Sequence, residues 1–317
     1  MRKLCVAVMI GIACATPGTA QTRVEPVVDH VHLNVPDQAK GVEWYQKYFG
    51  GKPMTEAPDR LMFGDTRLIF LKNDKGQPSA GSSLDHIGFS VADLDVKMKE
   101  FEAAGIKVAN PVRDVAGLFK LAFIEDPWGT RIEVVQDAEK LGLHHIHLRG
   151  PDPAAVLAWY KDKFGGETAK MKGRLDGLKY TDVWILVQRG DATPSEGHAV
   201  DHIGWRTPNL DAKTRELKAQ NVKFTTEPRP LKLASGTMVN FAYLEGPDGA
   251  RMAISFVKMA MELFHDGEWG WRALERAIGA DADVDEYTIL LPQAAKFAAA
   301  PGASEALGRV MAEVEKP

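Results

Sequence analysis

Hydrophobic and polar residues alternate in four short stretches of the chain that resemble one another. The segments VVDHVHLNV, LDHIGFSV, LHHIHLRG and VDHIGWRT each place a histidine at the same point of the alternating pattern. Such a pattern predicts a half-buried strand whose successive side chains point to opposite faces of a sheet. His30, His32 and Asn34 should therefore share one face of the first strand, and His86 should share a face with Ser90 in the second.

The four strands open four repeats of similar length. Intervals of 56, 59 and 57 residues separate His30, His86, His145 and His202. A period this regular indicates internal repeats. The motif WYxxxFGG follows the first and third strands, whereas VADLDVKMKEF and TPNLDAKTREL follow the second and fourth. Odd units resemble odd units and even units resemble even units, so the chain is predicted to be a duplicated pair.

Each unit is predicted to form a strand, a helix and then further strands. Helix N-caps of suitable type precede each helix, at Asp37, Asp93, Asp152 and Asn209. Residues that tolerate a left-handed conformation follow each helix, at Gly50-Gly51, Gly105, Gly165-Gly166 and Asn221. Alternating or apolar runs predict later strands, at 67–71, 120–125, 131–135, 183–187 and 239–245.

A single βαβββ unit is too small to bury one face of its own sheet, so we expect pairs of units to close a curved sheet around a cavity. The expected fold class is α+β. Units one and two should form one domain over residues 27–137, and units three and four a second domain over residues 143–257. Beyond the last repeat, residues 258–317 are Ala-rich and are predicted to form a helical extension that packs against the second domain.

The first twenty residues differ in character from the repeats. Arg2 and Lys3 precede the apolar run LCVAVMIGIACA, which is followed by small residues. This order predicts a signal peptide over residues 1–20 with cleavage before Gln21, and hence a periplasmic or secreted protein. The apolar run is too short to span a membrane, and no other apolar run approaches that length.

The charge of the chain argues against a polyanionic partner. Its 317 residues include 39 basic and 43 acidic side chains, a formal net charge of −4, and no basic cluster stands out. Nucleic acid and anionic membrane surfaces are therefore unsuitable partners. We expect a small-molecule substrate instead, and the oligomeric state stays open.

One carboxylate occupies an unusual place in the pattern. Glu133 lies in the segment RIEVV, a strand that is otherwise apolar enough to be buried. Burial of a carboxylate is costly unless it is paired or bound to a cation, and the candidates are an ion pair with Arg131 or a metal. Two histidines and one carboxylate that converge on a cavity form a known ligand set for a divalent metal with open positions.

Taken together, these motifs resemble the vicinal oxygen chelate superfamily, which includes glyoxalase, fosfomycin-resistance and extradiol-dioxygenase proteins. The four βαβββ units, the DH[VI] openings, the WY…FGG helix ends and the DPxGxxIE segment carry this resemblance over roughly 230 residues. It implies two tandem domains of that superfamily.

By position, the resemblance implies a divalent metal held by His30, His86 and Glu133 in the first domain. The ion would be Fe(II), Mn, Zn or Ni, because the ligand types do not select one of them. His32, two residues beyond His30, should face the same cavity and is a candidate acid–base group. A chelate that uses both His30 and His32 is an alternative.

The second domain lacks one member of this ligand set. Ala253 occupies the position that corresponds to Glu133, so His145 and His202 have no carboxylate partner there. We therefore expect one metal ion per chain and structural roles for these two histidines. His147 should also face a cavity, whereas His144 should point to the other face of its strand.

These observations predict an exported, divalent-metal-dependent enzyme that acts on a small substrate with two adjacent oxygens. A dioxygenase-type reaction is the first hypothesis, and a glyoxalase-like lyase or isomerase is the second. A different class of function is also consistent with the sequence, namely a non-catalytic protein that binds or sequesters a small molecule in an apolar cavity.

Overall fold

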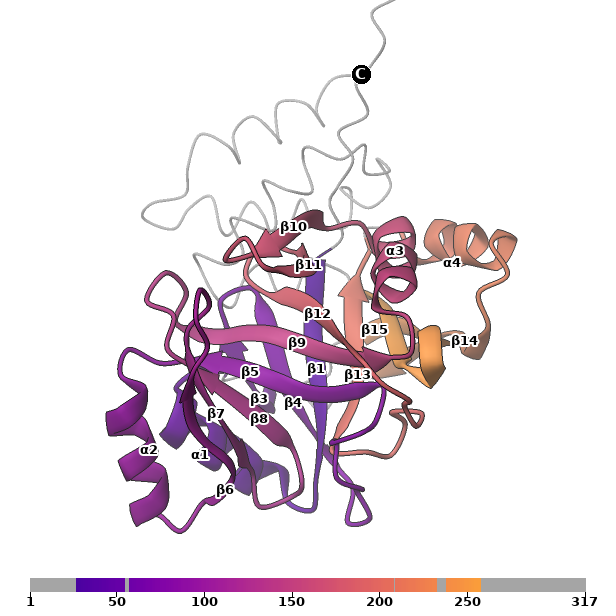
Figure 1. Cartoon of the computed structure of the whole chain (residues 1–317). Helices are drawn as coiled ribbons and strands as arrows, with labels where there is room; N and C mark the ends of the chain where they lie inside the picture. Colours follow the sequence, from indigo (N-terminus) through magenta and orange to yellow (C-terminus); the bar gives the residue numbers. More distant parts are fainter. Residues whose placement is uncertain (1–26, 55–56, 208, 233–237, 258–317) are drawn as a thin grey trace, which may run out of the picture.

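The chain folds into four consecutive βαβββ units, as the repeats predict (Figure 1). The structure is a computed structural model, which describes residues 27–54, 57–207, 209–232 and 238–257. The predicted signal peptide at 1–20 and the predicted helical extension at 258–317 lie outside the described residues. Within the described ranges, no helix is both long and apolar enough to cross a membrane.

The units have the same element order. The first contains β1 (Val27–Val35), α1 (Gln38–Phe49), β2 (Lys52–Met54), β3 (Ala57–Phe63) and β4 (Thr66–Lys72). The second contains β5 (Leu84–Ser90), α2 (Leu94–Ala103), β6 (Lys107–Asp114), β7 (Lys120–Glu125) and β8 (Arg131–Val135). The third contains β9 (Gly142–Gly150), α3 (Pro153–Phe164), β10 (Glu167–Met171), β11 (Leu175–Lys179) and β12 (Trp184–Arg189). The fourth contains β13 (Val200–Arg206), α4 (Leu210–Ala219), β14 (Phe224–Lys232), β15 (Met238–Glu245), the short 3₁₀ helix η1 (Pro247–Gly249) and β16 (Arg251–Val257).

The predicted helix boundaries are confirmed at both ends. Backbone N–H groups of the first turn donate to all four predicted N-caps, Asp37, Asp93, Asp152 and Asn209. The residues after the helices have φ angles between 58° and 76° at Gly50, Gly105, Gly165 and Asn221. Glycine and asparagine reach this left-handed region at lower cost than other residues, which explains why these residue types end the helices.

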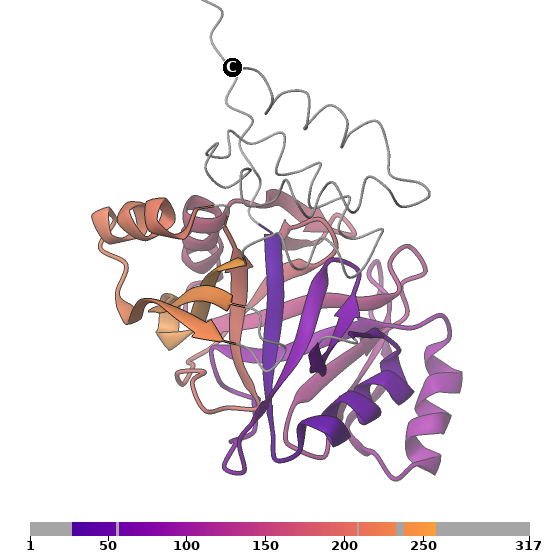
Figure 2. The ribbon, with the colours of Figure 1, turned by 180° about the vertical axis from the view of Figure 1, so that it is seen from behind.

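The strands form two eight-stranded sheets that each combine two units. The first sheet has the order β14-β15-β16-β13-β1-β4-β3-β2, and the second has the order β10-β11-β12-β9-β5-β8-β7-β6. The second sheet faces the viewer in Figure 1 and the first in Figure 2. Unit one therefore shares a sheet with unit four, and unit two with unit three.

This pairing corrects the expectation that units one and two would close a sheet together. Strand β1 pairs with β4 of its own unit along one edge, in parallel, and with β13 of unit four along the other edge, antiparallel. Strand β5 pairs in the same way with β8 and with β9 of unit three. Each unit leaves one edge of its first strand open, and the repeated sequence does not specify which other unit fills it.

The helices, in contrast, associate within each half of the chain. Helices α1 and α2 lie near each other at one end of the molecule, and α3 and α4 at the other end (Figures 1 and 2). The rings of Tyr48 and Phe101 are 5.8 Å apart between α1 and α2, and Lys213 Nζ of α4 lies 5.5 Å from the Phe164 ring of α3. The two halves are thus joined through shared sheets and separated at their helices.

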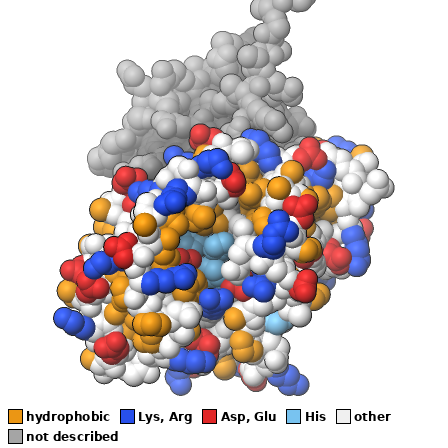
Figure 3. Space-filling model, in the orientation of Figure 1, with side chains coloured by type: hydrophobic (Ala, Val, Ile, Leu, Met, Phe, Trp, Pro, Cys, Tyr) orange, Lys and Arg blue, Asp and Glu red, His pale blue; other side chains and the backbone are white. Residues whose placement is uncertain are grey.

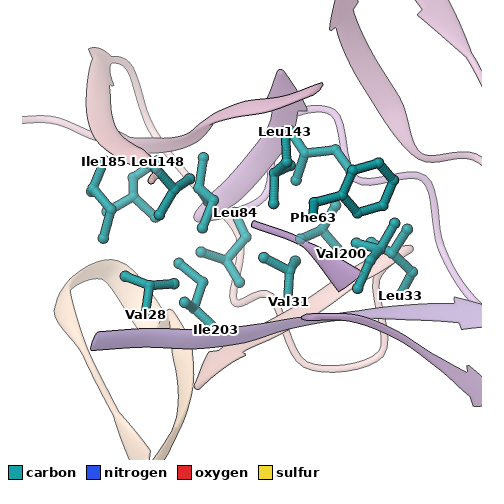
Figure 4. Close-up of a cluster of buried hydrophobic side chains, with 14 of the residues drawn as sticks. Val28, Val31, Leu33, Phe63, Leu84, Leu143, Leu148, Ile185, Val200 and Ile203 are labelled. Atoms are coloured by element: carbon teal, nitrogen blue, oxygen red, sulfur yellow. The ribbon is translucent and has the colours of Figure 1, made fainter. Parts of the chain in front are cut away.

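Apolar side chains fill the space between the two sheets. Val31 and Ile203 of the first sheet point toward Leu84 and Leu148 of the second (Figure 4), and all four are at most 1% exposed. Because side chains alternate along a strand, this packing turns His30 and His32 to the face of β1 that points away from the apolar core.

Candidate metal centres

Two groups of side chains in the described residues could each hold a metal ion. The ligand atoms within each group lie within 4.8 Å of one another. The group on the second sheet contains His86, Glu133, His145 and His147. The group on the first sheet contains His30, His32 and His202.

The structure therefore divides the predicted ligand set between the sheets. His86 and Glu133 come together as expected, but His30 does not join them, because β1 belongs to the sheet of units one and four. His145, expected to be structural, takes the place predicted for His30. His32, the predicted acid–base group, stays beside His30 in the other group.

The geometry of the first group fits a common cation. Glu133 Oε2 lies 3.1 Å from His86 Nε2 and 3.2 Å from His145 Nε2. Two ligands bonded to one ion at about 2.1 Å are about 3.0 Å apart at right angles and about 3.4 Å apart at the tetrahedral angle, so these separations, which also suit hydrogen bonds, fit adjacent metal ligands. The residues present fit a divalent ion with two imidazoles and one carboxylate. We call this group the Glu133 centre.

A β-bulge places a polar hydrogen-bond partner beside the first-strand histidine that recurs in all four units. In the antiparallel pairs β1–β13 and β5–β9, the register skips the residue before each histidine, at Asp29, Asp85, His144 and Asp201. The extra residue of a bulge can re-aim its side chain toward the face of its neighbour. His86 Nδ1 consequently lies 2.7 Å from Asp85 Oδ1, although the two residues are adjacent in a strand.

This contact determines where the lone pair of His86 points. A carboxylate accepts hydrogen bonds only, so Nδ1–H of His86 donates to Asp85. In the neutral ring Nε2 then carries the lone pair, which faces the Glu133 carboxylate. Two electron-rich atoms at this distance require a cation between them, either a proton or a metal. A partner of this type fixes the tautomer of metal-binding histidines.

His145 is oriented by a chain of two further groups. His144 Nε2 lies 3.3 Å from Asp137 Oδ2, and His144 Nδ1 lies 2.9 Å from His145 Nδ1. If His144 donates to Asp137, its Nδ1 accepts from His145, and Nε2 of His145 presents a lone pair to Glu133. His144 therefore does not point away from its neighbour as expected, because the bulge turns it toward His145.

A glycine makes room for the His145 ring. Gly88 is the register partner of both His145 and Glu133 in the second sheet. A Cβ atom at this position would overlap the imidazole of His145. The glycine of the DHIG motif therefore lets the ring lie directly over the neighbouring strand, and Gly204 does the same for His30 in the first sheet.

Burial and close contacts set the charges of the Glu133 centre. Burial lowers the pKa of His86, but hydrogen bonds to Asp85 and Glu133 outweigh it and raise the pKa overall. Burial also lowers the pKa of His145, to about 4, against the opposing effect of Glu133. Burial raises the pKa of Glu133, yet its contacts with His145, His147 and His86 hold it well below the usual value. The carboxylate is thus charged at neutral pH.

His147 connects the centre with the surface. Its Nδ1 lies 3.0 Å from His86 Nε2, and its side chain is 16% exposed, more than those of His86, Glu133 and His145. It also lines a groove of about 910 Å³ with residues of α3, β11 and β12. Histidine side chains are visible in a hollow at the centre of this face, among hydrophobic and charged neighbours (Figure 3). A molecule in the groove can therefore reach His147.

The sequence contains signals for the residues that the first interpretation missed. The dipeptide Asp-His occurs at three of the four openings, and His144-His145 stands at the fourth. The residue before each histidine is its hydrogen-bond partner in the structure. The spacing His-x-His occurs only in the odd units, where it supplies His32 and His147.

Comparisons with known proteins agree with this architecture. Residues 27–134 and 142–254 each match the model of the Glyoxalase/Bleomycin resistance protein/Dioxygenase superfamily. The structure of glyoxalase I from Zea mays is similar, with a TM-score of 0.59 and 20% sequence identity over 73% of this chain and 92% of that one. A putative dioxygenase from Bacillus subtilis subsp. subtilis str. 168 has a TM-score of 0.53 and 15% identity over 74% of this chain and 86% of that one. A search of curated proteins found no match.

Proposed function

The chain belongs to the Glyoxalase/Bleomycin resistance protein/Dioxygenase superfamily, and from that premise we propose that it is a divalent-metal-dependent enzyme whose active site is the Glu133 centre. His86, His145 and Glu133 would hold the ion. The substrate would be a small molecule with two adjacent oxygens, and the reaction would be of the dioxygenase type. The single observation that carries the proposal is the convergence of His86 Nε2 and His145 Nε2 on Glu133 Oε2, at 3.1 Å and 3.2 Å.

The donor set supports the choice of reaction. Two histidines and one carboxylate with open positions are typical of non-haem Fe(II) oxygenases. A bound divalent ion would supply Lewis acidity, which stabilises negative charge that develops on the oxygens of a chelating substrate. The protein supplies the rest. Asp85 and His144 hold the two imidazoles in orientation, and the apolar core behind the sheet keeps them from turning away.

His147 is the acid–base group of this proposal, in the role that the sequence assigned to His32. It lies two residues beyond His145, as His32 lies two beyond His30, and it faces the groove. Burial lowers its pKa, so the ring is neutral at neutral pH and can accept a proton from a hydroxyl group of the substrate. The groove is also lined by Lys161, Arg174 and Arg189 together with Asp162 and Asp176, so it offers hydrogen-bond donors and acceptors to a polar, oxygen-containing substrate.

Metal analysis tests the location of the site. The full chain should bind a divalent ion, and Glu133→Ala should lower the metal affinity by at least about tenfold. The reason is that this substitution removes one of three ligands and the only negative charge of the set. Glu125→Ala is the matched control, since Glu125 forms an exposed ion pair with Lys107. Equal metal content in the Glu133→Ala variant and the wild type would remove Glu133 from the site.

Oxygen uptake separates the possible reactions. With Fe(II) and a panel of catechols, the wild type should consume O₂, and His147→Gln should lower kcat by about 100-fold with Fe(II) still bound. The control variant is His198→Gln, since His198 is half-buried and its ring contacts the backbone oxygen of Pro78 instead of the Glu133 centre. If metal binds but no O₂ is consumed, the dioxygenase reaction is wrong and a glyoxalase-like lyase or isomerase takes its place. If neither metal nor substrate turnover is found, a binding or sequestering role remains.

We also propose that the chain is exported and loses residues 1–20, on the basis of the charged, apolar and small-residue segments in that order. Expression of the full chain followed by cell fractionation and N-terminal sequencing tests this. We expect the mature N-terminus at Gln21 in the periplasmic or secreted fraction. An intact N-terminus in the cytoplasm would contradict export without affecting the Glu133 centre.

A further inference from the structure

The histidines of the first sheet repeat the arrangement of the Glu133 centre. His30 pairs with Gly204 as His145 pairs with Gly88, and His32 pairs with His202 as His147 pairs with His86. In both sheets, each of these pairs therefore joins one residue of an odd unit to one residue of an even unit. One position differs, because Ala253 stands next to Gly204 where Glu133 stands next to Gly88.

Two of these histidines have one ring nitrogen held and the other buried without a partner. His30 Nδ1 lies 2.7 Å from Asp29, and His202 Nδ1 lies 2.6 Å from Asp201. Each carboxylate accepts the Nδ1–H, so each Nε2 carries the lone pair. Both Nε2 atoms are buried and make no hydrogen bond within the described part of the chain.

His32 adds a third nitrogen to the pair. Its Nδ1 is also buried without a hydrogen-bond partner among the described residues. The centroid of its ring lies 4.6 Å from that of His30 and 4.1 Å from that of His202. Buried polar atoms are normally satisfied, and three such nitrogens at one place form a site built to receive a ligand.

The carboxylates near this cluster are already engaged by cations. Asp29 binds the guanidinium groups of Arg67 and Arg206 as well as His30. Asp201 likewise contacts Arg251, 2.9 Å away. The arginines thus neutralise the two carboxylates that orient the imidazoles. The three histidines themselves carry no negative charge.

From this arrangement we propose that His30, His32 and His202 form a second metal site, which holds a borderline divalent cation such as Zn²⁺, Ni²⁺ or Cu²⁺ by three imidazoles. Neutral imidazoles suit these ions, whereas Mn²⁺ and Mg²⁺ favour oxygen ligands. The chain then binds two ions in different environments, one in each sheet. This site shares no ligand with the Glu133 centre, so the two proposals can fail separately.

The missing carboxylate gives the second site a distinct chemistry. In the Glu133 centre one positive charge of the ion is neutralised by a protein ligand, but at Ala253 the side chain is a methyl group. An ion held by three neutral imidazoles keeps its full charge and an open position on that side. The site should therefore accept a water molecule or a small anion from solution as its fourth ligand.

Titration of the metal-free full chain with Zn²⁺ tests the stoichiometry. We expect two ions per wild-type chain, one in Glu133→Ala, one in His202→Ala and fewer than one in the double variant. His198→Ala is the control and should still bind two. A single ion in the wild type that is unaffected by His202→Ala would overturn the second site. Two ions in Glu133→Ala would instead count against the Glu133 centre.

Two measurements do not depend on the folding of His202→Ala. Cu²⁺ added to Glu133→Ala at one ion per chain should give an EPR spectrum with nitrogen couplings from several imidazoles, and a spectrum without them would overturn the proposal. Ala253→Glu should rebuild the ligand set of the other sheet and raise Mn²⁺ affinity at the second site by at least about tenfold. Unchanged Mn²⁺ affinity in a folded Ala253→Glu protein would count against it equally.

Discussion

Gly88 and His145 face each other across β5 and β9, and the absence of a side chain on the first is what lets the ring of the second lie over the sheet. Because Gly88 also pairs with Glu133 on its other side, this one backbone position stands between two members of the Glu133 centre. The glycine of the DHIG motif is therefore needed to make room for the His145 ring, and not to form a backbone turn.

Substitution of this glycine should disrupt the centre without removing a ligand. In Gly88→Ala the new methyl group displaces the His145 ring, and we expect metal affinity to fall by about tenfold or more, because ligand geometry is lost. Metal titration measures the effect. Gly76→Ala is the control, since a Cβ there would meet neighbours only at 3.4 Å and beyond. The same affinity in Gly88→Ala and Gly76→Ala would contradict the arrangement.

The His144 chain predicts a loss and a rescue. His144→Ala removes the acceptor of His145 Nδ1–H and should weaken metal binding by about 10-fold to 100-fold. His144→Asp should restore most of the affinity, since aspartate holds this place before the other three histidines. Metal titration of both variants gives the comparison. If Asp and Ala at this position behave alike, His144 does not act by orienting His145.

Acid should destabilise the metal-free protein in a defined range. Burial raises the pKa values of Asp85 and Asp201, but hydrogen bonds to their histidines and nearby charges outweigh it and lower each to about 2. A folded-state pKa below the unfolded value of about 4 stabilises the fold at higher pH by an amount on the order of 2 kcal/mol per group. This stabilisation should be complete above pH of about 4 and disappear as the pH falls toward 2.

Unfolding in urea between neutral pH and pH 2 measures this effect. Asp201→Asn should be less stable than the wild type at neutral pH, and the difference should shrink as the pH falls, because the wild-type carboxylate becomes protonated. The exposed Asp74 supplies the control variant Asp74→Asn. A difference between Asp201→Asn and the wild type that stays constant over this range would show that the carboxylate is not the source of the stabilisation.

A buried hydrogen bond joins units one and two. Tyr45 Oη of α1 donates to Asp126 Oδ2 at 2.8 Å, and Asp126 Oδ1 accepts from the backbone of Trp128 and Thr130. Tyr45→Phe leaves the buried carboxyl group with one donor fewer, so we expect a loss of about 1 to 3 kcal/mol in the free energy of unfolding. Urea denaturation measures it. A loss below about 0.5 kcal/mol would indicate that Asp126 finds another donor.

Much of the fold could be predicted from local patterns. Asp37 and Asn209 cap helices because a side-chain oxygen close in sequence reaches the free N–H groups of the first turn, and Gly50 and Asn221 end helices for an equally local reason. The alternation of His30, Val31 and His32 likewise fixed which side chains share a face. None of these features depends on a distant part of the chain.

The side chains that meet in the Glu133 centre could be predicted only in part. His86 and Glu133 belong to the same unit, where β5 and β8 pair directly, so the sequence placed them together correctly. His145 was missed because its proximity depends on the β5–β9 pair between different units. The role of His144 was missed because a β-bulge overrides the simple alternation of side chains, which the sequence analysis had assumed.

The sequence by itself determined the four βαβββ units, the positions of their helices and strands, and the supply of imidazoles on one face of the opening strands. Only the tertiary structure decided that unit one joins unit four and unit two joins unit three, and hence that His30 and Glu133 lie in different centres. The physical reason is that hydrogen bonds within a unit are set by nearby residues. The open edge of a first strand offers the same backbone groups to every other unit, and the packing of the whole chain decides which one binds.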